Sequence, residues 1–144
     1  MWGDDDNKIE NVKICVDVSG FLFYTMSNTL TKSPYFEDIL TNIDTKTLTD
    51  DNIPYIFVDR DANGFTFILN YLRTGQLFLC DDNSKGFFNF LKCEANFYKL
   101  YDLSSLIDTY TNTKTFQQEL ISELKLCRTN VNKPQRTRTT DWNH

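Results

Sequence analysis

Residues 53–75, IPYIFVDRDANGFTFILNYLRTG, constrain the fold most, because they carry the signals of a strand, a tight turn and a helix in direct succession. The β-branched and aromatic side chains of residues 53–58 favour a strand. Asp61 stands where its carboxylate can cap a helix, and Gly75 stands where a left-handed cap ends one. A buried helical face between them is predicted by the i, i+3, i+4, i+7 spacing of Phe65, Ile68, Leu69 and Leu72.

The same stretch resembles the first half of a calcium-binding EF-hand loop. Positions 1, 3, 5 and 6 of such a loop are matched by Asp59, Asp61, Asn63 and Gly64. Position 12 is Asn70, whose neutral amide cannot replace the bidentate carboxylate that completes the cage. The segment before the loop also favours a strand where an EF-hand needs a helix. We therefore expect a structural joint that binds no calcium.

A β-hairpin and two short helices are expected before this joint. Residues 12–18 and 21–26 are predicted strands, and a Ser-Gly turn connects them. Ser27 is expected to cap a short helix, and a second helix is expected to begin at Pro34. Residues 41–52 are polar and poorly periodic, which indicates an exposed loop.

After the joint, residues 76–79 are predicted to form a short strand, and Ser84 is expected to cap a further helix. A Thr- and Asn-rich break at residues 111–113 separates a last amphipathic helix over residues 114–128, with a capping box from Thr115 to Gln118. Its apolar stripe comprises Phe116, Leu120, Leu124 and Cys127. Interleaved strands and helices, with three strands early, predict an α+β domain in which short helices cover a small sheet.

Composition excludes several classes of function. The chain of 144 residues suffices for one core, and its net charge of −5 argues against a nucleic-acid ligand. No apolar run approaches the roughly 20 residues of a membrane span, and the acidic N-terminus lacks the apolar core of a signal peptide, so we expect a cytoplasmic protein that does not contact membranes.

The sequence offers no recognisable catalytic or metal-binding set. The only histidine is His144, and four cysteines are scattered along the chain without a C-x-x-C pair. Neither a Ser-His-Asp set nor a Gly-rich phosphate loop occurs. We expect no enzyme activity, no cofactor and no metal.

The order and spacing of three segments resemble the BTB/POZ domain, specifically its potassium-channel-tetramerisation (KCTD) branch. These segments are VDVSGFLFYT, IFVDRDANGFTFILNYLRTGQL and EANFYKL. The resemblance assigns a BTB/POZ domain to residues 12–110 and leaves an acidic disordered N-terminus at 1–11, the amphipathic helix at 114–128 and a disordered tail at 129–144. That helix is expected either to pack on the domain or to mediate association.

The resemblance implies a non-enzymatic interaction module that forms a homo-pentamer or homo-tetramer and acts as an adaptor for a cullin-RING ubiquitin ligase. The alternative is a stand-alone assembly domain or a competitor of KCTD proteins, such as a viral mimic in the host cytoplasm. The expected interface between copies comprises Asp59, Arg60, Asp61, Phe67 and Tyr71, although the charges among them suit a local ion pair equally well. The expected cullin contacts are Tyr35, Phe36, Phe87 and Phe88, each of which also suits the core.

Overall fold

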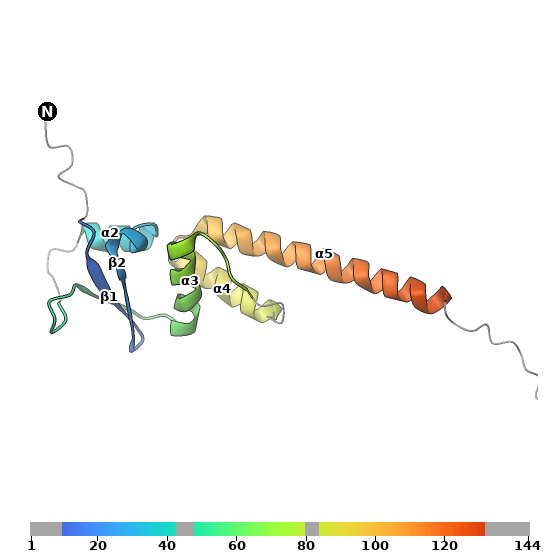
Figure 1. Ribbon diagram of the computed structural model, residues 1–144, viewed down its shortest axis with the longest axis horizontal. Helices are drawn as coiled ribbons and strands as arrows, with labels where there is room; N and C mark the ends of the chain where they lie inside the picture. Colours follow the sequence, from blue (N-terminus) through green and yellow to red (C-terminus); the bar gives the residue numbers. More distant parts are fainter. Residues whose placement is uncertain (1–9, 43–47, 80–83, 132–144) are drawn as a thin grey trace, which may run out of the picture. The chain divides into compact units, whose positions relative to one another are not determined.

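The computed structural model describes residues 10–42, 48–79 and 84–131, and for residues 127–131 it gives the helix only. It divides into two compact units, Met1–Asp108 and Thr109–His144. The expected disordered termini fall largely outside the described residues. In chain order (Figure 1), the elements are β1 (Lys13–Val18), β2 (Phe21–Met26), α1 (Ser27–Leu30), α2 (Pro34–Thr41), β3 (Tyr55–Val58), α3 (Ala62–Thr74), α4 (Lys85–Phe97) and α5 (Tyr101–Val131).

The first unit is built on a three-stranded sheet with the order β2-β1-β3. Strand β1 pairs antiparallel with β2 and parallel with β3. The predicted hairpin is confirmed, and its turn residues Ser19 and Gly20 have φ angles of 52° and 98°. A two-residue turn of this kind matches the twist of the flanking strands.

An aromatic cluster joins the inner face of the sheet to the helices. The ring of Phe65 on α3 lies 4.9 Å from Phe23 on β2, 6.0 Å from Phe36 on α2 and 5.6 Å from Tyr98 at the end of α4. Phe65, Phe36 and Tyr98 are all fully buried. Three helices and the sheet therefore share one core.

The predicted strand-to-helix joint is confirmed. Helix α3 follows β3 closely, and the Asp61 carboxylate accepts a hydrogen bond of 2.9 Å from the backbone N–H of Gly64. Gly75 ends the helix with a φ of 72°, a left-handed conformation that costs a glycine little. The Ser84 cap of α4 is also confirmed, because its hydroxyl oxygen accepts from the N–H of Phe87 at 3.2 Å.

Two local predictions are wrong. Ser27 is the first residue of α1 and not its cap. Its buried hydroxyl accepts from the N–H of Val12 and donates to the carbonyl of Glu10, so it fastens the segment before β1. Residues 76–79 form no strand, because they pair with none of the described strands. Of the expected loop at 41–52, residues 43–47 lie outside the described part.

The predicted break at residues 111–113 is also absent, since α5 runs continuously from Tyr101 to Val131. The Thr115 hydroxyl donates to the carbonyl of Thr111 at 3.0 Å, a bond within the helix that replaces the predicted capping box. Each Thr or Asn destabilises a helix by only tenths of a kcal/mol relative to Ala, so the helix continues through these residues when the residues on both sides are helical.

Candidate functional site

The outward-facing side of the sheet is apolar. The strand register pairs Asp17 with both Leu22 and Phe57, and Cys15 with Tyr24, which places these side chains on one face. Four large side chains of this face are exposed: Leu22 by 55%, Tyr24 by 44%, Met26 by 40% and Phe57 by 56%. We call these four residues the outer sheet face. An antiparallel pair with one face in water normally carries polar residues there, so this surface is unusual for a monomer.

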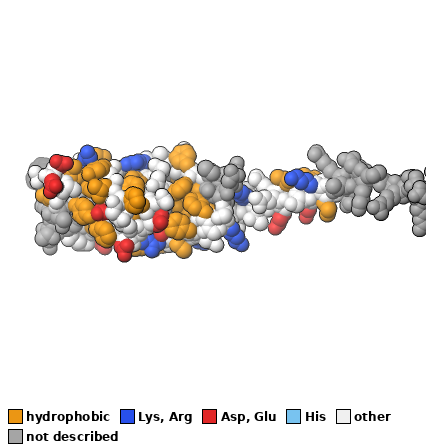
Figure 2. Space-filling view, turned by 90° about the horizontal axis from the view of Figure 1, so that it is seen from below, with side chains coloured by type: hydrophobic (Ala, Val, Ile, Leu, Met, Phe, Trp, Pro, Cys, Tyr) orange, Lys and Arg blue, Asp and Glu red, His pale blue; other side chains and the backbone are white. Residues whose placement is uncertain are grey.

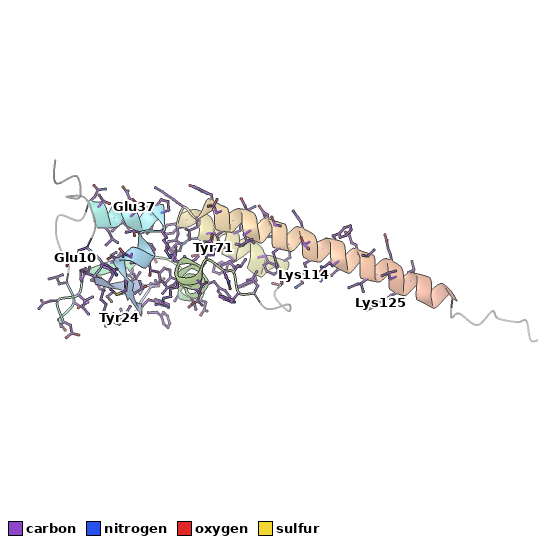
Figure 3. All side chains as sticks on the ribbon, turned by 45° about the horizontal axis from the view of Figure 1, so that its top comes forward. Glu10, Tyr24, Glu37, Tyr71, Lys114 and Lys125 are labelled. Atoms are coloured by element: carbon purple, nitrogen blue, oxygen red, sulfur yellow. The ribbon has the colours of Figure 1, made fainter. Side chains whose placement is uncertain are left out.

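The polar groups beside these four residues are occupied within the chain. The Tyr55 hydroxyl donates to the carboxylate of Asp17, and this hydrogen bond, with burial adding to it, raises the pKa of Tyr55. The other oxygen of Asp17 accepts from the N–H of Gly20 at 2.7 Å. The ammonium of Lys13 lies 5.1 Å from the centre of the Tyr24 ring. The outer sheet face therefore offers mainly apolar contact (Figure 3 labels Tyr24 on it).

The charge at the end of β3 is anchored inside the chain. The Arg60 guanidinium is paired with the carboxylate of Glu94, with a second contact of 3.4 Å from Nε to Oε2, and it lies 4.5 Å from the centre of the Phe97 ring. The Glu94 side chain is only 3% exposed. In the single chain, Arg60 therefore makes a local ion pair, and its role between copies stays a prediction. Sequence reasoning missed Glu94, although an acidic residue three positions after the buried Leu91 was a signal of a buried pair.

The other residues expected between copies lie in three places. Asp59 and Asp61 line a groove of about 510 Å³ that also includes Phe21, which is 65% exposed. We call this the strand-end groove. Tyr71 lines a different pocket of about 320 Å³ together with Lys32 and Lys99. Phe67 is half-buried, and its ring centre lies 5.2 Å from that of Phe87.

The family model of the BTB/POZ domain matches residues 14–108, about two thirds of the chain. The chain belongs to the BTB/POZ domain family. The predicted family and the α+β fold are thereby confirmed. BTB/POZ domains serve as protein-interaction and oligomerisation modules, which is the function that the family supports for this chain.

A curated relative is the potassium voltage-gated channel protein Shal of Drosophila melanogaster. The two sequences are 38% identical over 73 residues. This region covers 51% of the present chain and 12% of Shal, so the chain spans a small part of that relative's length. The match agrees with the channel-tetramerisation type of BTB/POZ domain.

Two of the four expected cullin contacts lie inside the BTB/POZ core. Phe36 is 0% exposed and stacks on Tyr98 in the aromatic cluster, while Phe88 is 3% exposed and its ring centre lies 6.0 Å from that of Phe87. Tyr35 and Phe87 are half-buried and keep some surface. The sequence pattern did not predict which of these four residues are buried. Adjacent aromatic residues on a helix point in different directions, and only the packing of the helix decides which of them is covered.

The described part of the BTB/POZ chain contains neither a metal-binding cluster nor a membrane-spanning helix. Among its residues, no three side chains of His, Cys, Asp or Glu gather closely enough to hold a metal ion. None of its described helices is both long and apolar enough to cross a bilayer. Apolar side chains instead reach the surface at many points of the first unit, between scattered charges (Figure 2).

Proposed function

We propose that this BTB/POZ domain assembles into a closed homo-oligomer of five or four copies, in which the outer sheet face of each copy covers the strand-end groove of the next. The observation that carries the proposal is the exposure of Leu22, Tyr24, Met26 and Phe57 on one side of the sheet. An interface between two different surfaces propagates from copy to copy and closes into a ring when the rotation allows it.

Charge supports this choice of the second surface. Lys13 stands on the same side of β1 as the outer sheet face, and its ammonium reaches the Tyr24 ring. The strand-end groove carries Asp59 and Asp61 beside the exposed Phe21. The groove also contains Arg60, whose charge is paired with Glu94, so its two aspartates are left to attract the lysine at the edge of the outer sheet face. Such complementarity selects one orientation.

The size of the patch is sufficient to contribute to assembly. Complete burial of a Leu or Phe side chain contributes about 1.5–3 kcal/mol. The four side chains are roughly half exposed, so covering each of them contributes about 1 kcal/mol before the cost of association. A stable ring therefore needs further contacts between residues around the outer sheet face and residues around the strand-end groove.

The mass in solution, measured by light scattering over a dilution series, tests the proposal. We expect a pentamer or a tetramer for the unmodified chain, and about tenfold weaker association for Phe57→Gln. Phe78→Gln is the matched control, because Phe78 is also 56% exposed but lies outside the outer sheet face. A monomer at every concentration contradicts the proposal, and so does equal association of the two variants.

Adaptor activity for a cullin is the narrower form of this function. It rests on the family resemblance and on the surface left at Tyr35 and Phe87. Recovery of a cullin with the purified chain supports an adaptor, and loss of that recovery in Tyr35→Ala locates the contact. An oligomer that recovers no cullin at micromolar concentration supports a stand-alone assembly domain or a competitor of other family members, including a viral one.

A further inference from the structure

The second unit carries an apolar stripe on its helix. In the part of α5 from Thr109 onward, Phe116 is 65% exposed, Leu120 46%, Ile121 50% and Leu124 56%. At about 100° of rotation per residue, these four side chains fall within an arc of about 140°. We call them the C-terminal stripe. Gln118, Ser122 and the exposed Leu126 lie on the other side of the helix.

A helix with this composition needs a partner for its apolar face. The segment from residue 109 to 117 is rich in Thr, Asn and Gln, which are poorer helix formers than Ala or Leu. Most of the stability of such a helix comes from packing an apolar face and not from intrinsic propensity. The C-terminal stripe is a surface of this kind, and it is exposed in the single chain.

We propose that the C-terminal stripe packs against the same stripe of neighbouring copies, so that the helices form a parallel bundle. This inference rests on the proposed self-association of the BTB/POZ domain. Cyclic symmetry gives every copy the same direction relative to the ring axis, so helices that meet at the axis run parallel.

The heptad positions favour the parallel register. With Leu120 at d and Leu124 at a, Phe116 takes position g and Ile121 takes position e. In a parallel coiled coil, a g residue faces the e residue that stands five positions further along the neighbouring helix. Phe116 of one copy therefore meets Ile121 of the next, and all four members of the stripe are covered together.

A second copy suits this stripe better than a membrane or an unrelated protein. Glu119 and Glu123 border the stripe at its Phe116 edge, and Lys114 and Lys125 border it at its Ile121 edge. Two edges of opposite charge suit a second copy of the same helix better than a uniformly anionic lipid surface. Thr113 and Gln117 precede Leu120 and Leu124 at the d and a positions, so the helices associate weakly by themselves. A ring raises their effective concentration to about the millimolar range, at which weak helix pairing becomes sufficient.

Photo-crosslinking of the full chain tests the inference. p-Benzoylphenylalanine replaces Leu124 in one variant and Ser122 in the matched control, since Ser122 lies on the opposite side of the same helical turn. We expect covalent multimers of this chain from position 124 and at least fivefold less from position 122. In a third variant, Leu120→Gln with Leu124→Gln, we expect the oligomer to dissociate at about tenfold higher protein concentration.

The outcomes separate this inference from the proposed ring. An oligomer in which position 124 crosslinks no better than position 122 overturns the helix bundle and leaves the ring intact. A monomeric wild type overturns both. Crosslinking at position 124 together with an unchanged mass of Phe57→Gln supports the bundle and contradicts the sheet interface. Binding of the chain to vesicles that contain phosphatidylserine, lost in the double variant and without crosslinking, identifies a membrane contact and overturns the bundle.

Discussion

Removal of the Arg60 side chain is expected to destabilise the fold of each chain and not primarily the contact between copies. In Arg60→Met, the carboxylate of Glu94 loses its cation while remaining 3% exposed. Breaking a buried ion pair by removal of one partner costs about 3–5 kcal/mol, because a charge is left buried without compensation. The Met side chain still covers part of Phe97, so the loss is mainly electrostatic.

The expected magnitude is somewhat below that range. The Arg60 side chain is 30% exposed, so water reaches one side of the pair and partly solvates the carboxylate that remains. We expect a loss of about 2–3 kcal/mol of the free energy of unfolding, which for a chain of this size lowers Tm by about 10 °C. Arg60→Glu should lose more, since it places a second carboxylate beside Glu94.

Urea unfolding at fixed protein concentration measures this loss, with the slope of the transition as a check that the unfolded state is unchanged. Arg60→Met with Glu94→Leu is the matched control, because an apolar pair leaves no buried charge and should recover most of the loss. If Arg60→Met keeps its stability but the oligomer dissociates, the Arg60 charge acts between copies and the local assignment is refuted.

Two further substitutions test the packing of the core. Burial raises the pKa of Tyr98, so its phenol stays protonated in the folded chain above pH 10 while the unfolded chain ionises near its usual pKa of about 10. Stability present below pH 10 is therefore lost as the pH rises, and urea midpoints at pH 7 and pH 11 should show a smaller drop for Tyr98→Phe. At pH 7 this variant should be as stable as the wild type, because the Tyr98 hydroxyl has no hydrogen-bond partner among the described residues, and a loss above about 1 kcal/mol would show that a partner exists. For Gly64→Ala we expect a loss of about 1–2 kcal/mol in thermal unfolding, since the new Cβ would lie 3.0 Å from both Glu94 Cγ and the Phe90 ring. Gly86→Ala is the control, because its Cβ would approach nothing closer than 3.7 Å, and equal stability of the two variants contradicts the close packing of α3 on α4.

The local signals of the sequence determined the elements whose causes lie within a few residues. The Ser-Gly turn, the Asp61 cap and the Gly75 helix end all depend on backbone conformations that neighbouring residues decide. The same holds for Ser84 at the start of α4. The strand-to-helix motif was specific enough to identify the BTB/POZ family, which the match over residues 14–108 confirms.

Only the tertiary structure decided which residues far apart in the sequence interact with each other. Arg60 and Glu94 are 34 positions apart, and nothing near Arg60 distinguishes a partner in the same chain from one in a neighbouring copy. Ser27 has the composition of a helix cap, but its hydroxyl is bonded to the backbone of Glu10 and Val12 once β1 and β2 pair. Side-chain chemistry limits which bonds a residue can make, and packing selects among them.

Exposure of the sheet also required the tertiary structure. The strands FLFYTM and YIFV are apolar on both faces, so alternation cannot tell which face the helices cover. Once the helices pack on the side of Phe65, the opposite side with Leu22 and Phe57 is left to solvent. The sequence thus determined that both faces of the sheet are apolar, which is more apolar surface than one layer of helices can cover. The packed fold decided which face stays exposed, because a sheet face is buried only by the elements that fold against it.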